Sequence, residues 1–347
     1  MAAIRVLVVE DSLTVRKRLV EVLAADPELE VVGEAEDGKV AIELCQELRP
    51  DVVTLDMMMP VMTGLAATEF IMAYCPTPIL VVSASTNRGE LFRTYEALAA
   101  GAVDVIEKPS ATGLDDGWVR TLRSTVKLVA RIKVITHPRG RLGGVHPAAP
   151  RSTPANPCRA LAIGASTGGP AALVEILKAM PADYSVPILL VIHITLAFAA
   201  GFAEWLDGQS PLRVRYAEDG ELLPSAGARG IVMAVPDRHL IVRHGRLRLT
   251  DDPERHSCRP SVDALFESVA RELGAQAAGC LLTGMGRDGA QGLLAIRRAG
   301  GTTLAQDEAT SVVFGMPGEA VRLGAAARVL PLDQMASALA ALGPRGI

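Results

Sequence analysis

Ser166 stands in a glycine-rich stretch, Gly164–Pro170 (GASTGGP), between an apolar run and a segment with helical periodicity. A serine on a tight turn from a strand into a helix is the arrangement of a hydrolase nucleophile. The same turn could instead bind a phosphate group through its backbone N–H groups, or Ser166 could only cap the helix. The stretch alone leaves all three interpretations open, because a nucleophilic serine also needs a base and an orienting acid.

Two residues elsewhere in the chain could supply these groups. His193 ends the apolar segment VPILLVIH, and Asp288 lies in the glycine-rich segment LLTGMGRDGAQG after another apolar run. If both apolar runs are strands of one parallel sheet, their carboxyl ends bring His193 and Asp288 to Ser166. The chain order Ser…His…Asp differs from the usual α/β-hydrolase order, but roles rather than order define such a triad.

The glycines around Asp288 allow close approach of a substrate to the backbone, and the N–H of Met285 is the candidate to bind an oxyanion. A base, an oxyanion donor and a serine together favour acyl transfer, the cleavage of an ester or amide. A dinucleotide site fits less well, because the glycine spacing is not GxGxxG and His193 stands where an acid is expected.

A second group of reactive side chains follows the predicted strands of the N-terminal part. Three carboxylates, one hydroxyl and one ammonium group are expected at one sheet edge: Glu10, Asp11, Asp56, Ser83 and Lys108. Clustered carboxylates suit Mg²⁺. The ion and a lysine could stabilise a phosphoryl group moving onto a carboxylate, for which Asp56 is the candidate.

Strands must alternate with helices to bring these residues together. Five apolar runs alternate with amphipathic segments up to about residue 135, and the second half again opens as strand, turn and helix. This pattern predicts an α/β protein with two doubly wound parallel-sheet domains, the second with an inserted β-hairpin within residues 229–251. The first domain is predicted over 1–135, the second over 158–347, and an exposed linker rich in Pro, Gly and Arg over 136–157.

The composition narrows the class of protein. The net charge of −4 gives no reason to expect nucleic acid as a partner. Five scattered cysteines without metal-ligand spacing are typical of a reducing cytosol. The sequence shows neither a signal peptide nor an apolar run long enough for membrane insertion, so a cytoplasmic location is expected.

The segments VVEDS, TLDMMMP, VVSAS and DVIEKP resemble the receiver domain of two-component response regulators. The resemblance implies a flavodoxin-like fold and phosphorylation of Asp56 by a histidine kinase. It implies Mg²⁺ held by Asp11, Asp56 and the carbonyl of Met58, with help from Glu10. It assigns the phosphoryl oxygens to Ser83 and Lys108.

The segments IGASTGGP, CRPSVDALFESVA, LTGMGRDGAQG and AQDEATSVVFGMP resemble the catalytic domain of the chemotaxis protein-glutamate methylesterases, the CheB family. The resemblance implies a Rossmann-like domain that demethylates glutamyl methyl esters on chemoreceptors and deamidates glutamines, without a cofactor of its own. It implies Ser166 as nucleophile, His193 as base and Asp288 as orienting acid, with Thr167 and Met285 in support.

The sequence departs from this family beside the base. The segment after His193 lacks the family's two prolines and has gained apolar residues, and Cys258 stands where a histidine is usual. Substrate preference is therefore open. We expect the receiver to cover the esterase cleft until Asp56 is phosphorylated. The rival hypotheses are a phosphorylation-controlled binding protein with a weakened site and, with less support, a phosphate-binding domain that uses Gly164–Pro170.

Overall fold

The computed structural model describes residues 2–84, 87–108, 116–132, 134, 158–225 and 227–343. The chain divides into two compact units, Met1–Gly143 and Gly144–Ile347. The predicted linker lies outside the described residues, so its boundaries stay a prediction. Among the described residues, no helix is long and apolar enough to cross a membrane.

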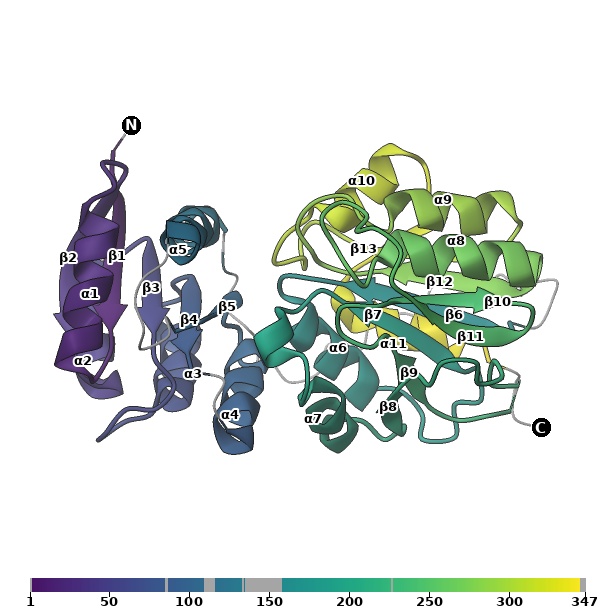
Figure 1. The fold of residues 1–347 in the computed structure, drawn as a ribbon, viewed down its shortest axis with the longest axis horizontal. Helices are drawn as coiled ribbons and strands as arrows, with labels where there is room; N and C mark the ends of the chain where they lie inside the picture. Colours follow the sequence, from purple (N-terminus) through teal and green to yellow (C-terminus); the bar gives the residue numbers. More distant parts are fainter. Residues whose placement is uncertain are drawn as a thin grey trace. The chain divides into compact units, whose positions relative to one another are not determined.

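The first unit alternates strands and helices from end to end (Figure 1). Its elements are β1 (Ile4–Val9), α1 (Leu13–Ala24), β2 (Leu29–Ala35), α2 (Gly38–Leu48), β3 (Val52–Leu55), α3 (Gly64–Tyr74), β4 (Ile79–Ser83), α4 (Arg88–Ala99), β5 (Asp104–Glu107) and α5 (Asp116–Val129). The five strands are parallel in the order β2-β1-β3-β4-β5. This order confirms the predicted flavodoxin-like sheet.

Helices cover both faces of this sheet, which explains why its strands read as continuous apolar runs. Helix α1 contacts α5, whereas α2, α3 and α4 pack against one another in succession. Most helices begin at a polar N-cap, as where Thr63 Oγ1 accepts the N–H of Ala66 at the start of α3. Thr63 therefore has a local structural role.

The second unit opens with β6 (Ala160–Ala165), α6 (Gly169–Lys178), β7 (Ile188–Ile192), the 3₁₀ turn η1 (Leu196–Phe198), α7 (Phe202–Gln209), β8 (Val214–Tyr216) and β9 (Ile231–Met233). It continues with β10 (His239–Arg243), β11 (Arg246–Thr250), α8 (Val262–Leu273), η2 (Gly274–Gln276), β12 (Ala277–Leu281) and α9 (Ala290–Arg298). It ends with β13 (Thr302–Gln306), α10 (Met316–Arg322), β14 (Arg328–Leu330) and α11 (Leu332–Ala340).

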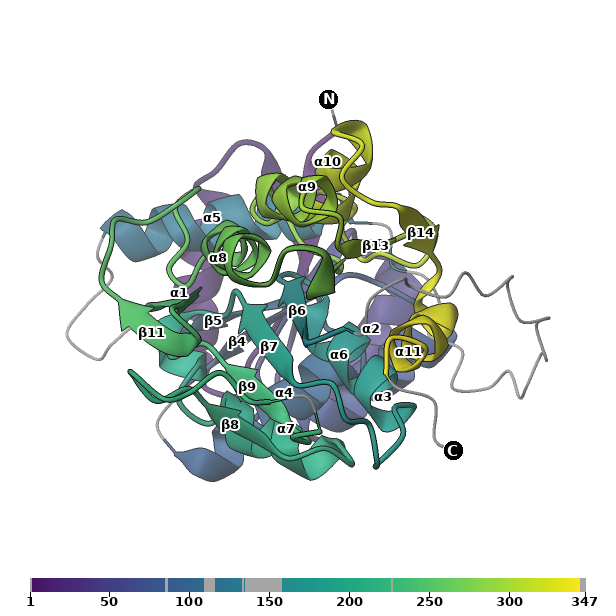
Figure 2. The ribbon, with the colours of Figure 1, turned by 90° about the vertical axis from the view of Figure 1, so that its right-hand side faces the viewer.

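Seven parallel strands form the main sheet of this unit in the order β14-β13-β12-β6-β7-β9-β8. Helices α8 and α9 lie on one face, and α6, α7 and α11 on the other (Figure 2). The antiparallel hairpin β10–β11 packs against α8 and confirms the predicted insertion. Phe266 and Leu293 are fully buried between α8, α9 and the sheet.

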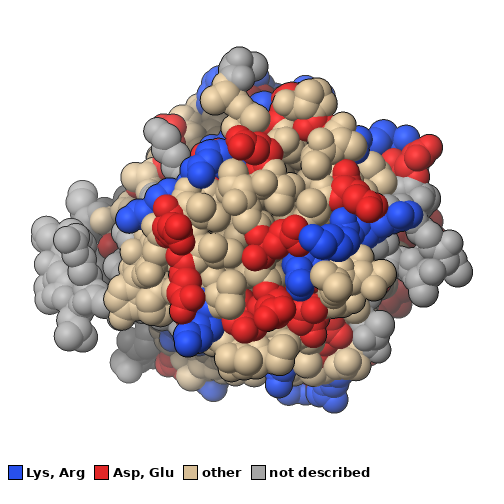
Figure 3. Space-filling view, turned by 90° about the vertical axis from the view of Figure 1, so that its left-hand side faces the viewer, with Lys and Arg blue, Asp and Glu red and all other residues tan. Residues whose placement is uncertain are grey.

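Acidic and basic side chains are interspersed on the face of the molecule drawn in Figure 3. Among the ion pairs of the first unit, Lys17 lies 3.0 Å from Glu34, with side chains 58% and 30% exposed. Exposed pairs of this kind stabilise a protein by at most about 1 kcal/mol each. This face therefore offers a mixed-charge surface.

Candidate active site and phosphorylation site

Three adjacent strands in the middle of the second sheet carry the predicted triad. Ser166 follows β6, His193 follows β7, and Asp288 lies between β12 and α9. Since β12, β6 and β7 are neighbours, their carboxyl ends form one edge. Backbone hydrogen bonds join these ends: the His193 N–H donates to Ala165 O at 3.0 Å, and the Ser166 N–H donates to Thr283 O at 3.0 Å.

The loop after β12 packs directly against Ser166. A Cβ atom added at Gly284 would lie 2.8 Å from Ser166 Cβ and 2.3 Å from Met316 Sδ. Only glycine allows this approach of the two loops. The neighbouring residue Met285 is partly exposed, and in the described part of the chain its N–H has no acceptor. This N–H therefore remains available to a substrate beside Ser166.

Asp288 lies at the amino end of helix α8. Its Oδ1 accepts hydrogen bonds from Ser261 Oγ at 2.8 Å, the Asp263 N–H at 3.0 Å and the Gly289 N–H at 3.1 Å. Its Oδ2 accepts from the Val262 N–H at 2.7 Å and faces His193 Nε2 at 3.0 Å. A buried carboxylate with this many donors is fixed in position and kept ionised.

The two members of the pair stabilise each other's charged forms. Burial disfavours the imidazolium form of His193, but the hydrogen bond to Asp288 and the nearby Cys258 outweigh it and raise its pKa to about 9. Burial also disfavours the Asp288 carboxylate, but the hydrogen bonds from His193 and from the start of α8 lower its pKa. The contact fixes the orientation of the ring, whose neutral form is the one that can act as a base.

The second ring nitrogen of His193 faces a residue that the sequence analysis did not place in the triad. Cys258 Sγ lies 3.7 Å from His193 Nδ1 and 3.4 Å from the carbonyl oxygen of His256. Among the described residues, the Ser166 hydroxyl has no hydrogen-bond partner, although it is only partly buried at the same edge. The structure thus brings Ser166, His193 and Asp288 to one edge, and joins the latter two directly.

Thr283 and Gln306 position the serine loop, and sequence reasoning missed both. Thr283 Oγ1 donates to the carbonyl oxygen of Thr167 at 3.0 Å and accepts the Val313 N–H at 3.0 Å. Gln306 Oε1 accepts the Thr283 N–H at 2.8 Å. Gln306 ends β13, the next strand of the sheet, so its strand-end position was the signal that could have revealed it.

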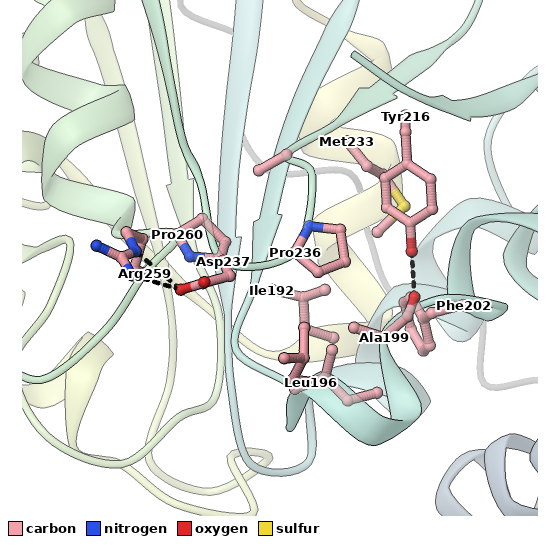
Figure 4. A pocket seen from close by; sticks show the side chains of 12 residues that line it. Ile192, Leu196, Ala199, Phe202, Tyr216, Met233, Pro236, Asp237, Arg259 and Pro260 are labelled. Carbon is pink, nitrogen blue, oxygen red and sulfur yellow. Dashed lines mark hydrogen bonds and ion pairs between the residues drawn. The ribbon is translucent and has the colours of Figure 1, made fainter. Parts of the chain in front are cut away.

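A mostly apolar pocket of about 190 Å³ adjoins the base (Figure 4). Ile192 and Ile194, on either side of His193, line it together with Leu196 and Phe202. Asp237 and Arg259 form an ion pair of 2.8 Å at one side. The altered segment after His193 therefore forms one wall of this pocket, as its apolar sequence allows.

The carboxylates of the first unit also converge. Ligand oxygens of Glu10, Asp11 and Asp56 lie within 4.8 Å of one another. Lys108 Nζ lies 2.9 Å from Glu10 Oε2 and 3.0 Å from Asp56 Oδ1. Gly64, the first glycine after Asp56 in the chain, packs closely against the backbone of Asp56. A Cβ atom added at Gly64 would lie 2.0 Å from the Asp56 carbonyl oxygen.

Burial dominates the electrostatics of this cluster. It raises the pKa of Glu10 to about 7, and Asp56 adds to this rise while Lys108 opposes it. Burial likewise raises the pKa of Asp56 against the effect of Lys108. Glu10 Oε2 is buried and, among the described residues, accepts no well-oriented hydrogen bond. Three converging carboxylates with a single nearby ammonium group fit a hard divalent cation such as Mg²⁺.

Ser83 is fully buried at the end of β4 and faces helix α4 rather than the carboxylates. Its hydroxyl donates to Glu90 Oε1 at 3.0 Å, and Thr94 Oγ1 lies 3.4 Å away. Met58 follows Asp56 in the loop, with its side chain partly exposed. Of the five predicted side chains, the structure therefore groups Glu10, Asp11, Asp56 and Lys108, and directs the Ser83 hydroxyl elsewhere.

Comparison with protein families gives two matches, one within each of the two units of the chain. The model of the CheB methylesterase family matches residues 161–339, and that of the response regulator receiver domain matches residues 6–114. The structure is also similar to the methylesterase catalytic domain of CheB from Thermotoga maritima. That match has 34% sequence identity and a TM-score of 0.50, and it covers 53% of this chain and 98% of that domain.

Curated relatives are similar over nearly the full length. A protein-glutamate methylesterase/protein-glutamine glutaminase of Anaeromyxobacter dehalogenans is 48% identical, covering 97% of this chain and 96% of that protein. Proteins with the same description from Nitrosospira multiformis and Myxococcus xanthus are 44% and 45% identical, each covering 97% of this chain and 96% of the relative.

Proposed function

The chain belongs to the CheB methylesterase family, as a protein-glutamate methylesterase/protein-glutamine glutaminase regulated by a receiver domain in chemotaxis signalling, and we propose that Ser166, His193 and Asp288 perform its hydrolysis. The observation that carries this proposal is the buried 3.0 Å contact between His193 Nε2 and Asp288, one strand away from Ser166.

The three residues have distinct tasks in the reaction. His193 takes the proton of the Ser166 hydroxyl as Oγ bonds to the carbonyl carbon of the glutamyl methyl ester, and then gives that proton to the departing methanol. Water, deprotonated by the same ring, then attacks the acyl carbon, and the ring returns the proton to the departing Ser166 Oγ. Asp288 stabilises the imidazolium between these transfers. For a glutamine substrate, ammonia leaves in place of methanol.

The glycine-rich loop supplies the remaining contacts. The free N–H of Met285, beside Ser166, donates to the oxyanion, and Thr167 is held in support by Thr283. The hydrogen bond from Ser166 to His193 forms when substrate closes the site, since catalytic hydrogen bonds are commonly loose in the free enzyme. The apolar pocket lined by Leu196 and Ile194 binds an apolar side chain of the substrate near the ester.

In the receiver, Asp56 accepts a phosphoryl group from a histidine kinase. Asp11, Asp56 and the Met58 carbonyl would hold Mg²⁺, with Glu10 helping, and the ion supplies charge neutralisation for phosphoryl oxygens. Lys108, already 3.0 Å from Asp56, binds one of those oxygens. Ser83 leaves Glu90 to bind another. This movement of Ser83 is the signal that relieves inhibition of the esterase.

The substrates of this function are methylated chemoreceptors, and the phosphodonor is a kinase of the chemotaxis type. The family and the receiver domain support both partners and a cytoplasmic place of action. Nothing in the reaction requires a cofactor in the esterase domain.

Methanol release from methylated chemoreceptor by the full-length protein tests the proposal. We expect release that rises when beryllofluoride mimics phosphorylated Asp56 and that falls at least about 10³-fold in Ser166→Ala. Asp56→Asn should keep the basal rate and lose the response. Folded protein that binds receptor but releases no methanol in either state would instead support the binding protein with a weakened site.

A further inference from the structure

We propose that Cys258 is a reactive thiol activated by His193, and that its oxidation by hydroperoxides switches the hydrolase off. The second half of this proposal rests on the role of His193 as the base. The first half rests only on the surroundings of the thiol, and it can be measured without any esterase activity.

Cys258, His193 and Asp288 form a continuous chain of contacts. Sγ lies 3.7 Å from Nδ1 of the ring, and Asp288 holds Nε2 on the other side at 3.0 Å. A thiol against an imidazole that is itself oriented by a carboxylate is the arrangement that produces a nucleophilic thiolate. The ring side chain is 15% exposed and the carboxylate 2%, so the pair is shielded from water. Cys258 itself is partly exposed, so reagents can reach it.

The backbone presents Cys258 on a fixed turn. Arg255 and Cys258 exchange two backbone hydrogen bonds of 2.9 and 3.1 Å, and the two residues between them, His256 and Ser257, have φ of 53° and 60°. Two non-glycine residues in the left-handed region are uncommon and are kept only where the surroundings enforce them. The turn therefore holds the thiol against the ring.

Side chains fasten this turn to helix α8. The Arg255 guanidinium forms a bidentate salt bridge with the Glu267 carboxylate, with N–O distances of 2.8 and 2.7 Å. His256 Nε2 lies 3.1 Å from the buried Asp263, and Arg287 Nε donates to His256 Nδ1 at 3.2 Å. The distance between thiol and imidazole is thus set by several contacts outside the pair itself.

The other four cysteines have the opposite environment. Cys45, Cys75, Cys158 and Cys280 are buried, whereas Cys258 is partly exposed. Burial raises the pKa of Cys158 to about 11 and that of Cys280 to about 12. Buried thiols kept in the protonated form are inert toward oxidants and alkylating reagents. The protein therefore carries its own internal controls for thiol reactivity.

The modification is a balanced two-electron oxidation. The thiol gives up its proton as its sulfur attacks a hydroperoxide, an S–O bond forms and the O–O bond breaks. The leaving oxygen takes a proton and departs as water from hydrogen peroxide, or as an alcohol from an organic hydroperoxide. The sulfenic acid oxygen then occupies the space beside Nδ1, the nitrogen that must otherwise serve Ser166.

Labelling of the full-length protein with iodoacetamide, followed by mass spectrometry of its cysteine peptides, tests the first half. We expect Cys258 to react at least about 10-fold faster than the four buried cysteines. Reaction at Cys258 should slow about 10-fold in His193→Gln and stay at the wild-type rate in Ser166→Ala, which leaves the pair intact. Circular dichroism of His193→Gln distinguishes loss of the contact from loss of the fold.

Hydrogen peroxide tests the second half. We expect treated wild-type protein to lose methanol release in proportion to sulfenic acid trapped at Cys258 by dimedone, and to regain it with dithiothreitol. The activity that Cys258→Ser retains should be insensitive to peroxide. Equal labelling of all five cysteines overturns the reactive thiol, and peroxide-sensitive Cys258→Ser overturns the switch. Fast labelling of a protein that never releases methanol overturns the proposed function and the switch, but supports the reactive thiol.

Discussion

Ser261 joins helix α8 to the acid of the triad, because one hydroxyl serves both. Its Oγ donates to Asp288 Oδ1 at 2.8 Å and accepts the Ala264 N–H at 3.3 Å as the N-cap of the helix. Ser261 is fully buried, so water does not compete for either contact. The start of α8 and the orientation of the base are therefore parts of one structure.

Replacing Ser261 with alanine should lower both stability and kcat. We expect a loss of about 1 kcal/mol in the free energy of unfolding, from the missing cap. We expect kcat to fall about 10-fold with KM unchanged, because Asp288 loses a fixed donor. Asp37→Ala, which removes the N-cap of α2 in the first unit, is the matched control and should leave kcat unchanged. Equal kcat in Ser261→Ala and wild type would contradict the link.

The pH dependence of kcat/KM should report on His193. The base must be neutral to accept a proton, and the contact with Asp288 raises its pKa to about 9. The rate should therefore rise about tenfold per pH unit below that value and level off above it. Asp288→Asn removes the stabilising charge, so its lower rate should level off at a lower pH. A wild-type rate that is flat from neutral pH upward would contradict this assignment.

Gly284→Ala should impair the reaction without loss of the receiver response. The new Cβ would lie 2.8 Å from Ser166 Cβ, so the serine loop must move. A displacement of this kind can reduce kcat about 10²-fold. Gly208→Ala in helix α7 is the control, because its Cβ meets nothing within 4 Å. Reaction of a fluorophosphonate probe with Ser166 gives the readout.

Leu196→Asp should raise KM for methylated receptor about tenfold at little cost in stability. Leu196 lines the pocket beside His193 and is 66% exposed, so its replacement removes an apolar contact for substrate rather than for the core. Val329→Asp, at a half-exposed position in β14, is the matched control. A lowered kcat with unchanged KM would show that the pocket acts on the chemistry instead.

Gly64→Ala should abolish the response to beryllofluoride. A Cβ at this position would lie 2.0 Å from the Asp56 carbonyl oxygen and must displace the loop that carries the phosphorylated residue. Gly89→Ala, whose Cβ would lie 3.4 Å from its nearest neighbour, is the control. The fluorescence of Trp118, whose indole donates to the Glu107 carbonyl oxygen, can follow binding in the receiver.

The sequence predicted the strand ends well because parallel strands buried on both faces leave apolar runs that end in polar residues. Ser166 and His193 directly follow such runs, whereas Asp288 lies in the glycine-rich loop after a third run. Besides the two 3₁₀ turns, five elements of the second unit escaped prediction: α7, β8, α10, β14 and α11. Strands β8 and β14 have only three residues each, too few for alternation to stand out.

Side-chain contacts between distant parts of the chain were harder to predict than the positions of residues at the strand ends. Nothing near Cys258 in the chain indicates that a turn of left-handed residues brings its sulfur to His193, 65 positions earlier. Ser83 was placed at the correct strand end, but its hydroxyl turns to Glu90 because α4 presents an acceptor there. Rotamers and loop turns depend on tertiary packing, which a single sequence does not encode locally.

The strand order of the second sheet also determines which motions of the domain can separate the three residues of the site. Ser166, His193 and Asp288 follow β6, β7 and β12, which all lie inside the sheet, while β8 and β14 form its edges. Fraying begins at edges and termini, where the free energy of opening is smallest. The hydrolase therefore keeps its geometry through local fluctuations of the domain, and the three residues separate only when the central strands part in global unfolding.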